Sequence, residues 1–163
     1  MKWLNSIFNK KEKKENPEIS PERLENGWDE VFDATFSGDL DKMLSVTELK
    51  TKPINRHYLL QTIISETYKL RKEEKYRNIC IEHSEKHLKE FSEIAIELKK
   101  NDSGNLPRVS TFQNYATLLT ELGEYEKAIS ICKMAISFGL NDGTKSNYQG
   151  RIDRINKKML NNK

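Results

Sequence analysis

Three residues of the sequence have the spacing of metal ligands, namely Cys80, His83 and His87. Offsets of three and seven residues place them on one face of a helix, and thiolate and imidazole groups both bind Zn²⁺. The same face continues as an apolar seam to Phe91, and the chain has no CxxC motif and no second histidine pair. Because structural zinc sites have four ligands, we expect these side chains to be packed without a metal. A zinc-dependent structural module is kept as a third hypothesis.

No other motif of the sequence indicates catalysis. The chain has no glycine-rich phosphate loop, no HExxH motif and no glycine-flanked serine nucleophile. His57 stands alone beside Tyr58, and the adjacent carboxylates Glu73 and Glu74 lie in a charged stretch that we expect to be solvated, which does not suit them to acid–base work. We therefore expect a protein that is not an enzyme and that uses no cofactor.

Charge is unevenly distributed along the 163 residues, whose formal net charge is +3. Residues 1–16 contain five Lys and two Glu, and residues 145–163 contain six basic residues and one Asp, so the stretch between them carries −5. Two basic ends around an acidic body do not form one large nucleic-acid surface. An alternative function remains, a nucleic-acid or membrane-surface accessory protein that uses residues 10–14 and a basic helix face of Arg151, Arg154 and Lys158.

The sequence predicts a flexible basic arm, residues 1–19, in front of one helical domain, residues 20–163. Within the arm, Trp3, Leu4, Ile7 and Phe8 fall on one side of a two-turn helix and precede a run of lysines. Such a segment is suited to weak contact with a membrane surface. The other interpretations are a mobile arm, or an arm docked on the body or on a second copy, so a homodimer is an open alternative.

The chain has two cysteines, Cys80 and Cys132, at helical positions that we expect to be buried. Two cysteines do not make a disulfide framework. No stretch is apolar and long enough to span a membrane, and Trp3 to Phe8 is too short for a secretory signal. These observations predict a cytoplasmic protein with reduced thiols.

Helical periodicity runs through every long segment of the chain, and strand-type alternation is almost absent. The sequence therefore predicts an all-α fold. The expected helices form pairs, 21–36 with 39–46, 55–72 with 75–100, and 109–122 with 124–138. The first helix carries one continuous apolar stripe, made of Leu24, Trp28, Val31, Phe32, Thr35 and Phe36.

A last helix begins near Ser146, whose spacing to Gln149 fits a capping box. We expect its apolar stripe to cover the open end of the stack, with the basic face pointing to solvent. The stripe consists of Tyr148, Ile152, Ile155 and Met159.

Residues 109–140 resemble one tetratricopeptide repeat (TPR), in which two helices meet at a tight turn, and the two earlier helix pairs resemble it only in degenerate form. The matching positions are the turn residues Gly123 and Tyr125 and the small residues Ala116, Ala128 and Ala135. The departures are Phe112 where the family has tryptophan, Leu119 where it has tyrosine, and Leu140 where it has a closing proline. The resemblance implies a helical-hairpin scaffold that binds other proteins or peptides.

Together these patterns predict a short right-handed TPR-like array of three hairpins with a C-terminal capping helix. The expected function is a non-enzymatic adaptor or regulator that holds a peptide or helix of a partner protein. The resemblance implies that the binding face is lined by the first helix of the repeat, with Tyr115, Thr117 and Leu118 as candidates. For Tyr115 we favour a place in the core.

Overall fold

The computed structural model describes residues 21–162, of which 72% are helical, with no strand among them. This confirms the prediction of an all-α protein. The helices of this range are α1 (Pro21–Glu25), α2 (Glu30–Thr35), α3 (Leu40–Ser45), α4 (Pro53–Lys69), α5 (Glu74–Asn101), α6 (Ser110–Glu121), α7 (Tyr125–Ser137) and α8 (Asn147–Asn161). The predictions made for the arm of residues 1–19, including its apolar residues Trp3, Leu4, Ile7 and Phe8, lie outside the described residues.

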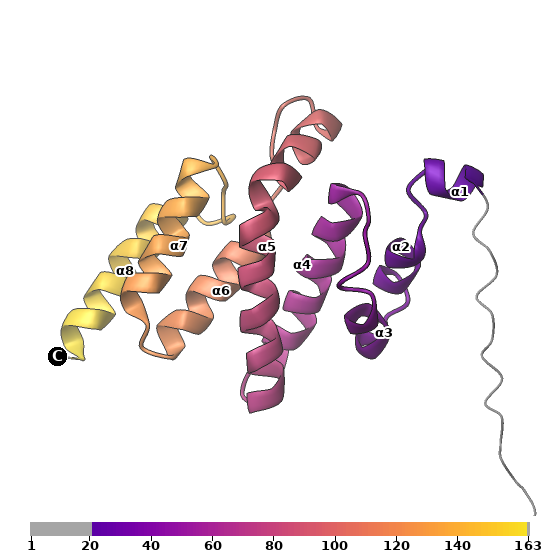
Figure 1. Cartoon of the computed structure of the whole chain (residues 1–163). Coiled ribbons are helices and arrows are strands. Elements are labelled where there is room, and N and C mark those ends of the chain that lie inside the picture. Colours follow the sequence, from indigo (N-terminus) through magenta and orange to yellow (C-terminus); the bar gives the residue numbers. More distant parts are fainter. Residues whose placement is uncertain (1–20, 163) are drawn as a thin grey trace, which may run out of the picture.

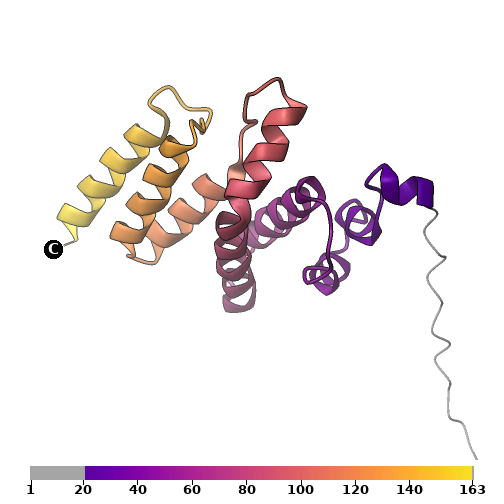
Figure 2. The same cartoon turned by 45° about the horizontal axis from the view of Figure 1, so that its top comes forward.

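The helices are arranged in space in nearly the order of the sequence (Figure 1). Helix α2 packs against α3, α4 against α5, and α6 against α7. Successive pairs touch through α2, α3 and α4 and then through α4, α5 and α6, while α8 packs against α7. The result is an elongated row with α1 at one end and α8 at the other, as the turned view also shows (Figure 2).

The turn between α6 and α7 forms as the sequence predicts. Gly123 has a φ of +78°, a left-handed conformation that glycine adopts without a steric penalty. The backbone N–H of Gly123 donates to the Thr120 carbonyl, and that of Glu124 donates to the Leu119 carbonyl. These two bonds satisfy the last carbonyls of α6 and reverse the chain.

The single helix predicted over residues 21–36 is wrong. Gly27 takes a φ of +79° and ends α1, and Asp29 then caps α2 by accepting a hydrogen bond from the Phe32 N–H at 2.8 Å. A helix needs negative φ angles throughout, so the left-handed turn at Gly27 divides the apolar stripe between two short helices. The predicted stripe is therefore not continuous.

One helix start and one helix cap also differ from expectation. Helix α4 begins at Pro53, two residues before the predicted start at residue 55, because proline is well suited to the first helical position. The predicted capping box of α8 is wrong, because Ser146 makes no side-chain cap bond and the Gln149 amide donates to Asp153 at 3.1 Å.

Buried apolar side chains form three clusters within residues 21–162. The largest joins the second half of α5 to α6, α7 and α8, and it includes Ala116, Ala128 and Ala135, each fully buried. The second joins α2, α3 and α4, and the third is a small one of Leu60, Ile64, Cys80 and Leu118. None of the helices in this range is both long enough and apolar enough to cross a membrane.

Candidate functional site

Three aromatic side chains follow one another along α2, namely Trp28 just before the helix, then Phe32 and Phe36. A spacing of four residues puts them in one row, with ring centroids 6.4 Å apart for Trp28 and Phe32 and 4.7 Å apart for Phe32 and Phe36. Trp28 is 47% exposed and Phe36 is 68% exposed. The row is therefore an accessible apolar surface beside the buried residues of the same helix.

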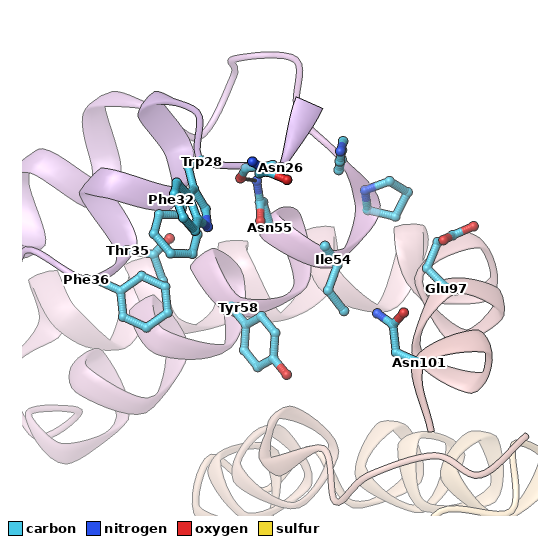
Figure 3. Close-up of a pocket in the computed structure, with 13 residues that line it drawn as sticks. Asn26, Trp28, Phe32, Thr35, Phe36, Ile54, Asn55, Tyr58, Glu97 and Asn101 are labelled. Atoms are coloured by element: carbon cyan, nitrogen blue, oxygen red, sulfur yellow. Dashed lines mark hydrogen bonds between the residues drawn. The ribbon is translucent and has the colours of Figure 1, made fainter. Parts of the chain in front are cut away.

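This row is one wall of an open cleft with a volume of about 620 Å³. Helix α4 supplies Ile54 and Tyr58 across from the row, and the last turns of α5 supply Glu97 and Asn101 on the far side (Figure 3). Tyr58 is 45% exposed, so three exposed aromatic rings surround one hollow. Clefts of this size are typical of binding sites. We define the aromatic cleft by Trp28, Phe32, Phe36, Ile54 and Tyr58.

Asp29 ties the two walls of the aromatic cleft together. Besides capping α2, its carboxylate accepts hydrogen bonds from the Thr51 hydroxyl and from the Asn55 amide, the latter at 3.2 Å. The Asn55 amide also donates to the Gly27 carbonyl at 2.6 Å. Because Asn55 is buried in the first turn of α4, these bonds set the position of the aromatic row relative to α4.

The part of the chain that contains the aromatic row is strongly acidic. Residues 21–49 contain eight acidic and two basic residues, a net charge of −6. The charged groups that line the cleft itself are Lys52, which donates to the Glu25 carbonyl at 2.7 Å, and Glu97. The surroundings of the cleft therefore favour a ligand that combines apolar side chains with positive charge.

Two of the residues expected to contact a partner lie in the interior. Tyr115 is fully buried, and its hydroxyl donates to the Glu85 carboxylate at 2.8 Å; burial raises the pKa of Tyr115 to about 12. Leu118 is 1% exposed and belongs to the small cluster between α4, α5 and α6. Because α6 packs against α4, α5 and α7 at once, neither side chain offers a surface to a partner. The position of Tyr115 agrees with the core interpretation favoured for it, whereas the expected partner contact through Leu118 is wrong.

Thr117, the third expected contact, lies with the basic helix face in a groove of about 250 Å³ between α6 and α8. Arg151 donates to the Thr117 hydroxyl at 2.9 Å and to the Asp142 carboxylate at 3.2 Å. The Asp142 side chain is fully buried, so the Arg151 guanidinium serves to hold the loop before α8. The expectation that the whole basic face points to solvent is therefore wrong for Arg151.

The remaining basic residues of this groove, Arg154 and Lys158, are exposed. Glu121 lines the same groove, and its carboxylate pairs at 2.8 Å with Arg71, in the turn that follows α4. The groove thus combines two exposed cations with one carboxylate and is smaller and more polar than the aromatic cleft.

The three residues with metal-ligand spacing bond in different directions. The Cys80 sulfur faces the Ile64 carbonyl at 3.8 Å, and the His83 Nδ1–H donates to the Ile79 carbonyl at 2.9 Å. His87 points elsewhere, toward α4 and α6. Within residues 21–162, no group of three His, Cys, Asp or Glu side chains is arranged to hold a metal ion.

His87 is the middle of a buried polar chain across three helices. Its Nε2 lies 3.0 Å from His57 Nδ1 on α4, and its Nδ1 lies 2.8 Å from the Thr111 hydroxyl on α6. Burial lowers the pKa of His57 to about 4, and burial together with the neighbouring His57 lowers that of His87 to about 3. The pair is therefore neutral and structural, although the sequence shows His57 as an isolated residue.

The aromatic cleft was not predicted, because the single stripe expected for this segment contains two separate rows of side chains. Val31 and Thr35 are buried against the neighbouring helices, whereas Trp28, Phe32 and Phe36 form the second row. A helix with one buried face needs only one of these rows. The sequence shows both rows, but apolar periodicity alone does not tell which of them is buried.

The aromatic cleft is therefore suited to apolar ligands, and the groove between α6 and α8 is smaller and more polar. Proteins similar to this chain would indicate whether either surface is a known type of binding site. A comparison of the chain with protein-family models, with curated proteins and with solved structures found no match in any of the three.

Proposed function

We propose that this protein is a non-enzymatic adaptor or regulator that binds a short segment of a partner protein in the aromatic cleft between α2 and α4. The observation that carries the proposal is the convergence of Trp28, Phe36 and Tyr58, each between 45% and 68% exposed, on one hollow. Exposed apolar patches of this kind are uncommon on proteins that act alone. Covering each ring with a ligand contributes on the order of 1–2 kcal/mol.

The chemistry of the partner segment follows from the walls of the cleft. Aromatic walls favour aromatic or branched aliphatic side chains, which stack on the rings or fill the space between them. The net charge of −6 on residues 21–49 favours lysine or arginine beside those apolar residues. The partner is therefore a peptide or helix with one or two large apolar anchors and adjacent positive charge.

For the architecture, the proposal is a short right-handed TPR-like array with α8 as its C-terminal cap. It is supported by the pairing of α2 with α3, α4 with α5 and α6 with α7, and by the position of α8 beyond α7. The left-handed turn at Gly123 and the full burial of Ala116, Ala128 and Ala135 are in keeping with it.

The test is a selection of displayed random peptides on the full-length chain. Selected peptides should contain Trp, Phe, Leu or Ile next to Lys or Arg, and fluorescence polarisation gives the affinity of one of them. Phe36→Ser should weaken that affinity roughly tenfold or more, as hot-spot residues do. Leu160→Ser is the matched control, since Leu160 is 66% exposed and Phe36 is 68% exposed, but only Phe36 lines the cleft. Equal affinities for the two variants would refute the site.

The alternative function, a nucleic-acid or membrane-surface accessory protein, receives less support. Of its basic face, Arg151 is held by Asp142 and Thr117, which leaves Arg154 and Lys158 beside the carboxylate of Glu121. This alternative is tested by measuring the affinity of the protein for DNA, RNA and anionic vesicles at increasing salt concentration. Contacts to phosphate groups would give an affinity that falls steeply with salt.

A further inference from the structure

We propose that residues 3–8 of this chain occupy the aromatic cleft within the same molecule and that a partner must displace them. This inference rests on the proposed function, because it names the resident occupant of the same cleft. Residues 21–162 leave the cleft open, with the side chains of Trp28 and Phe36 accessible. The sequence in front of the described residues supplies a segment of matching chemistry.

The match begins with the apolar residues of the segment. Trp3, Leu4, Ile7 and Phe8 provide two aromatic and two aliphatic side chains, whose spacing in the sequence is that of one helical face. These are the types of anchor that fill aromatic-walled clefts, in the manner of an amphipathic helix lying in a groove. A cleft of about 620 Å³ accepts part of such a face.

Charge adds to the match. Residues 1–16 carry five Lys and two Glu, a net side-chain charge of +3, and four of the lysines lie between positions 10 and 14, directly after the apolar residues. The helices around the aromatic row belong to the stretch 21–49, whose net charge is −6. Opposite charges of this size steer the segment toward this end of the molecule and away from the basic α8.

The connection is also long enough. The cleft is lined by Asn26, Gly27 and Trp28, which follow α1 directly. Residues 9–20 span up to ~40 Å when extended. The helix that lies between this tether and the cleft, α1, has five residues and is only about 7.5 Å long, so the tether can reach back past it. A tether of this length gives an effective concentration of about millimolar, so even a weak segment occupies the cleft of its own chain in preference to that of another.

The experiment uses Trp28 as its own reporter. The chain has two tryptophans, so Trp3→Phe leaves Trp28 as the only emitter and keeps a ring at position 3. The comparison protein carries Trp3→Ser, Leu4→Ser, Ile7→Ser and Phe8→Ser in the full-length chain. Trp28 should emit at shorter wavelength and be less quenched by acrylamide in the Trp3→Phe protein than in the fourfold serine protein. Identical emission and quenching would overturn the inference.

A second measurement separates the same molecule from a second copy. A synthetic peptide of residues 1–14 should bind the fourfold serine protein and bind the Trp3→Phe protein roughly tenfold more weakly, because the tethered segment competes with it. Shielding of Trp28 should not depend on protein concentration, and sedimentation should show a monomer. Shielding that rises with concentration together with a dimer would overturn the intramolecular form and assign the cleft to a second copy.

The two proposals fail in different ways. If Trp28 is indifferent to residues 3–8 while selected peptides still depend on Phe36, the inference falls and the proposed function stands. If residues 3–8 shield Trp28 but no displayed peptide binds either protein, the occupancy of the cleft by residues 3–8 stands, and the adaptor function falls together with the displacement by a partner. Leu160→Ser in the Trp3→Phe background is the control, because Leu160 lies outside the cleft and should leave the emission of Trp28 unchanged.

Discussion

The buried histidine pair makes the stability of this protein depend on pH. His57 and His87 are each 1% exposed, and their pKa values lie near 4 and 3 in the folded chain against 6.5 for an unperturbed histidine. The unfolded chain therefore binds more protons than the folded one below pH 6.5. Each histidine removes about 1.4 kcal/mol of unfolding free energy per pH unit as the pH falls from 6.5 toward its folded pKa.

Urea unfolding at a series of pH values measures this slope. We expect His57→Gln to reduce it by about half, because one of the two titrating side chains is gone. His83→Gln is the control, since the His83 ring bonds a carbonyl of its own helix. Equal slopes for the wild type and His57→Gln would contradict the assignment of the histidine pair.

Asp29 both caps a helix and links two helices, whereas Asp39 only caps a helix. The Asp29 carboxylate caps α2 and also accepts hydrogen bonds from Thr51 and Asn55, whereas Asp39 only caps α3 through the Lys42 N–H. We expect Asp29→Ala to cost about 2–4 kcal/mol and Asp39→Ala about 1 kcal/mol, because lost caps and lost bonds to a carboxylate add up. Chemical denaturation measures the free energy of unfolding of both variants. Similar losses for the two would count against Asp29 as the link between α2 and α4.

The prediction that no metal is bound depends on three individual side chains. Because Cys80, His83 and His87 bond to separate partners, purified untagged protein should contain no stoichiometric zinc by elemental analysis. Zinc that disappears on His83→Gln would instead support the zinc-dependent module.

At the scale of elements, the α6–α7 hairpin depends on small residues. Ala128 is fully buried where the two helices meet. Replacing it by Leu should lower the free energy of unfolding by about 1–3 kcal/mol through overpacking. Ser130→Leu, at an exposed position of the same helix, is the matched control, and equal melting of the two variants would argue against close packing at Ala128.

The helices were predictable where one face is buried and the ends carry clear signals. Helices α5, α6 and α7 agree with the predicted ranges to within one residue at each end, because their apolar periodicity is unbroken and Gly123 marks the turn. Residues 21–36 were mispredicted although Asn26-Gly27 is a local turn signal, because the apolar stripe that runs across it was interpreted as one helix. In the structure the left-handed turn at Gly27 is also held by Asn55, a residue distant in sequence.

The candidate site was less predictable than the fold. Tyr115 and Leu118 carry helical periodicity that suits either a core or a binding face, and only the packing of α6 between three helices decides for the core. The link between Arg151 and Asp142 joins α8 to a loop nine residues earlier, so periodicity alone placed that side chain in solvent. Trp28 and Phe36 showed the reverse error, because apolar periodicity does not distinguish burial from a cleft.

For the whole molecule, the two ends of the chain should contribute unequally to stability. Helix α8 covers α7 with Tyr148, Ile152 and Ile155, each no more than 6% exposed, and removal of residues 146–163 exposes the surface beneath them. We expect that deletion to lower the melting temperature steeply or to make the protein insoluble.

Removal of residues 1–16 should have a much smaller effect. If the tethered segment weakens the binding of a free peptide tenfold, its own binding adds about 1.4 kcal/mol to the free energy of unfolding. For a chain of this size, that raises the melting temperature by no more than a few degrees. Thermal melts of the two deletions test both expectations. A large loss of stability on removing residues 1–16 would show that the arm is part of the folded core.

The division of the core into separate clusters has a consequence for motion. The cluster of α2, α3 and α4 holds six buried apolar residues, and that of α5 to α8 holds eighteen. Segments with few buried contacts open by local unfolding while the rest of the chain stays closed. Backbone amides of α2 and α3 should therefore take up deuterium sooner than those of α6 and α7 under native conditions. Because α2 forms a wall of the aromatic cleft, a bound ligand should slow exchange in this hairpin first, and mass spectrometry would then detect occupancy in the unmodified protein.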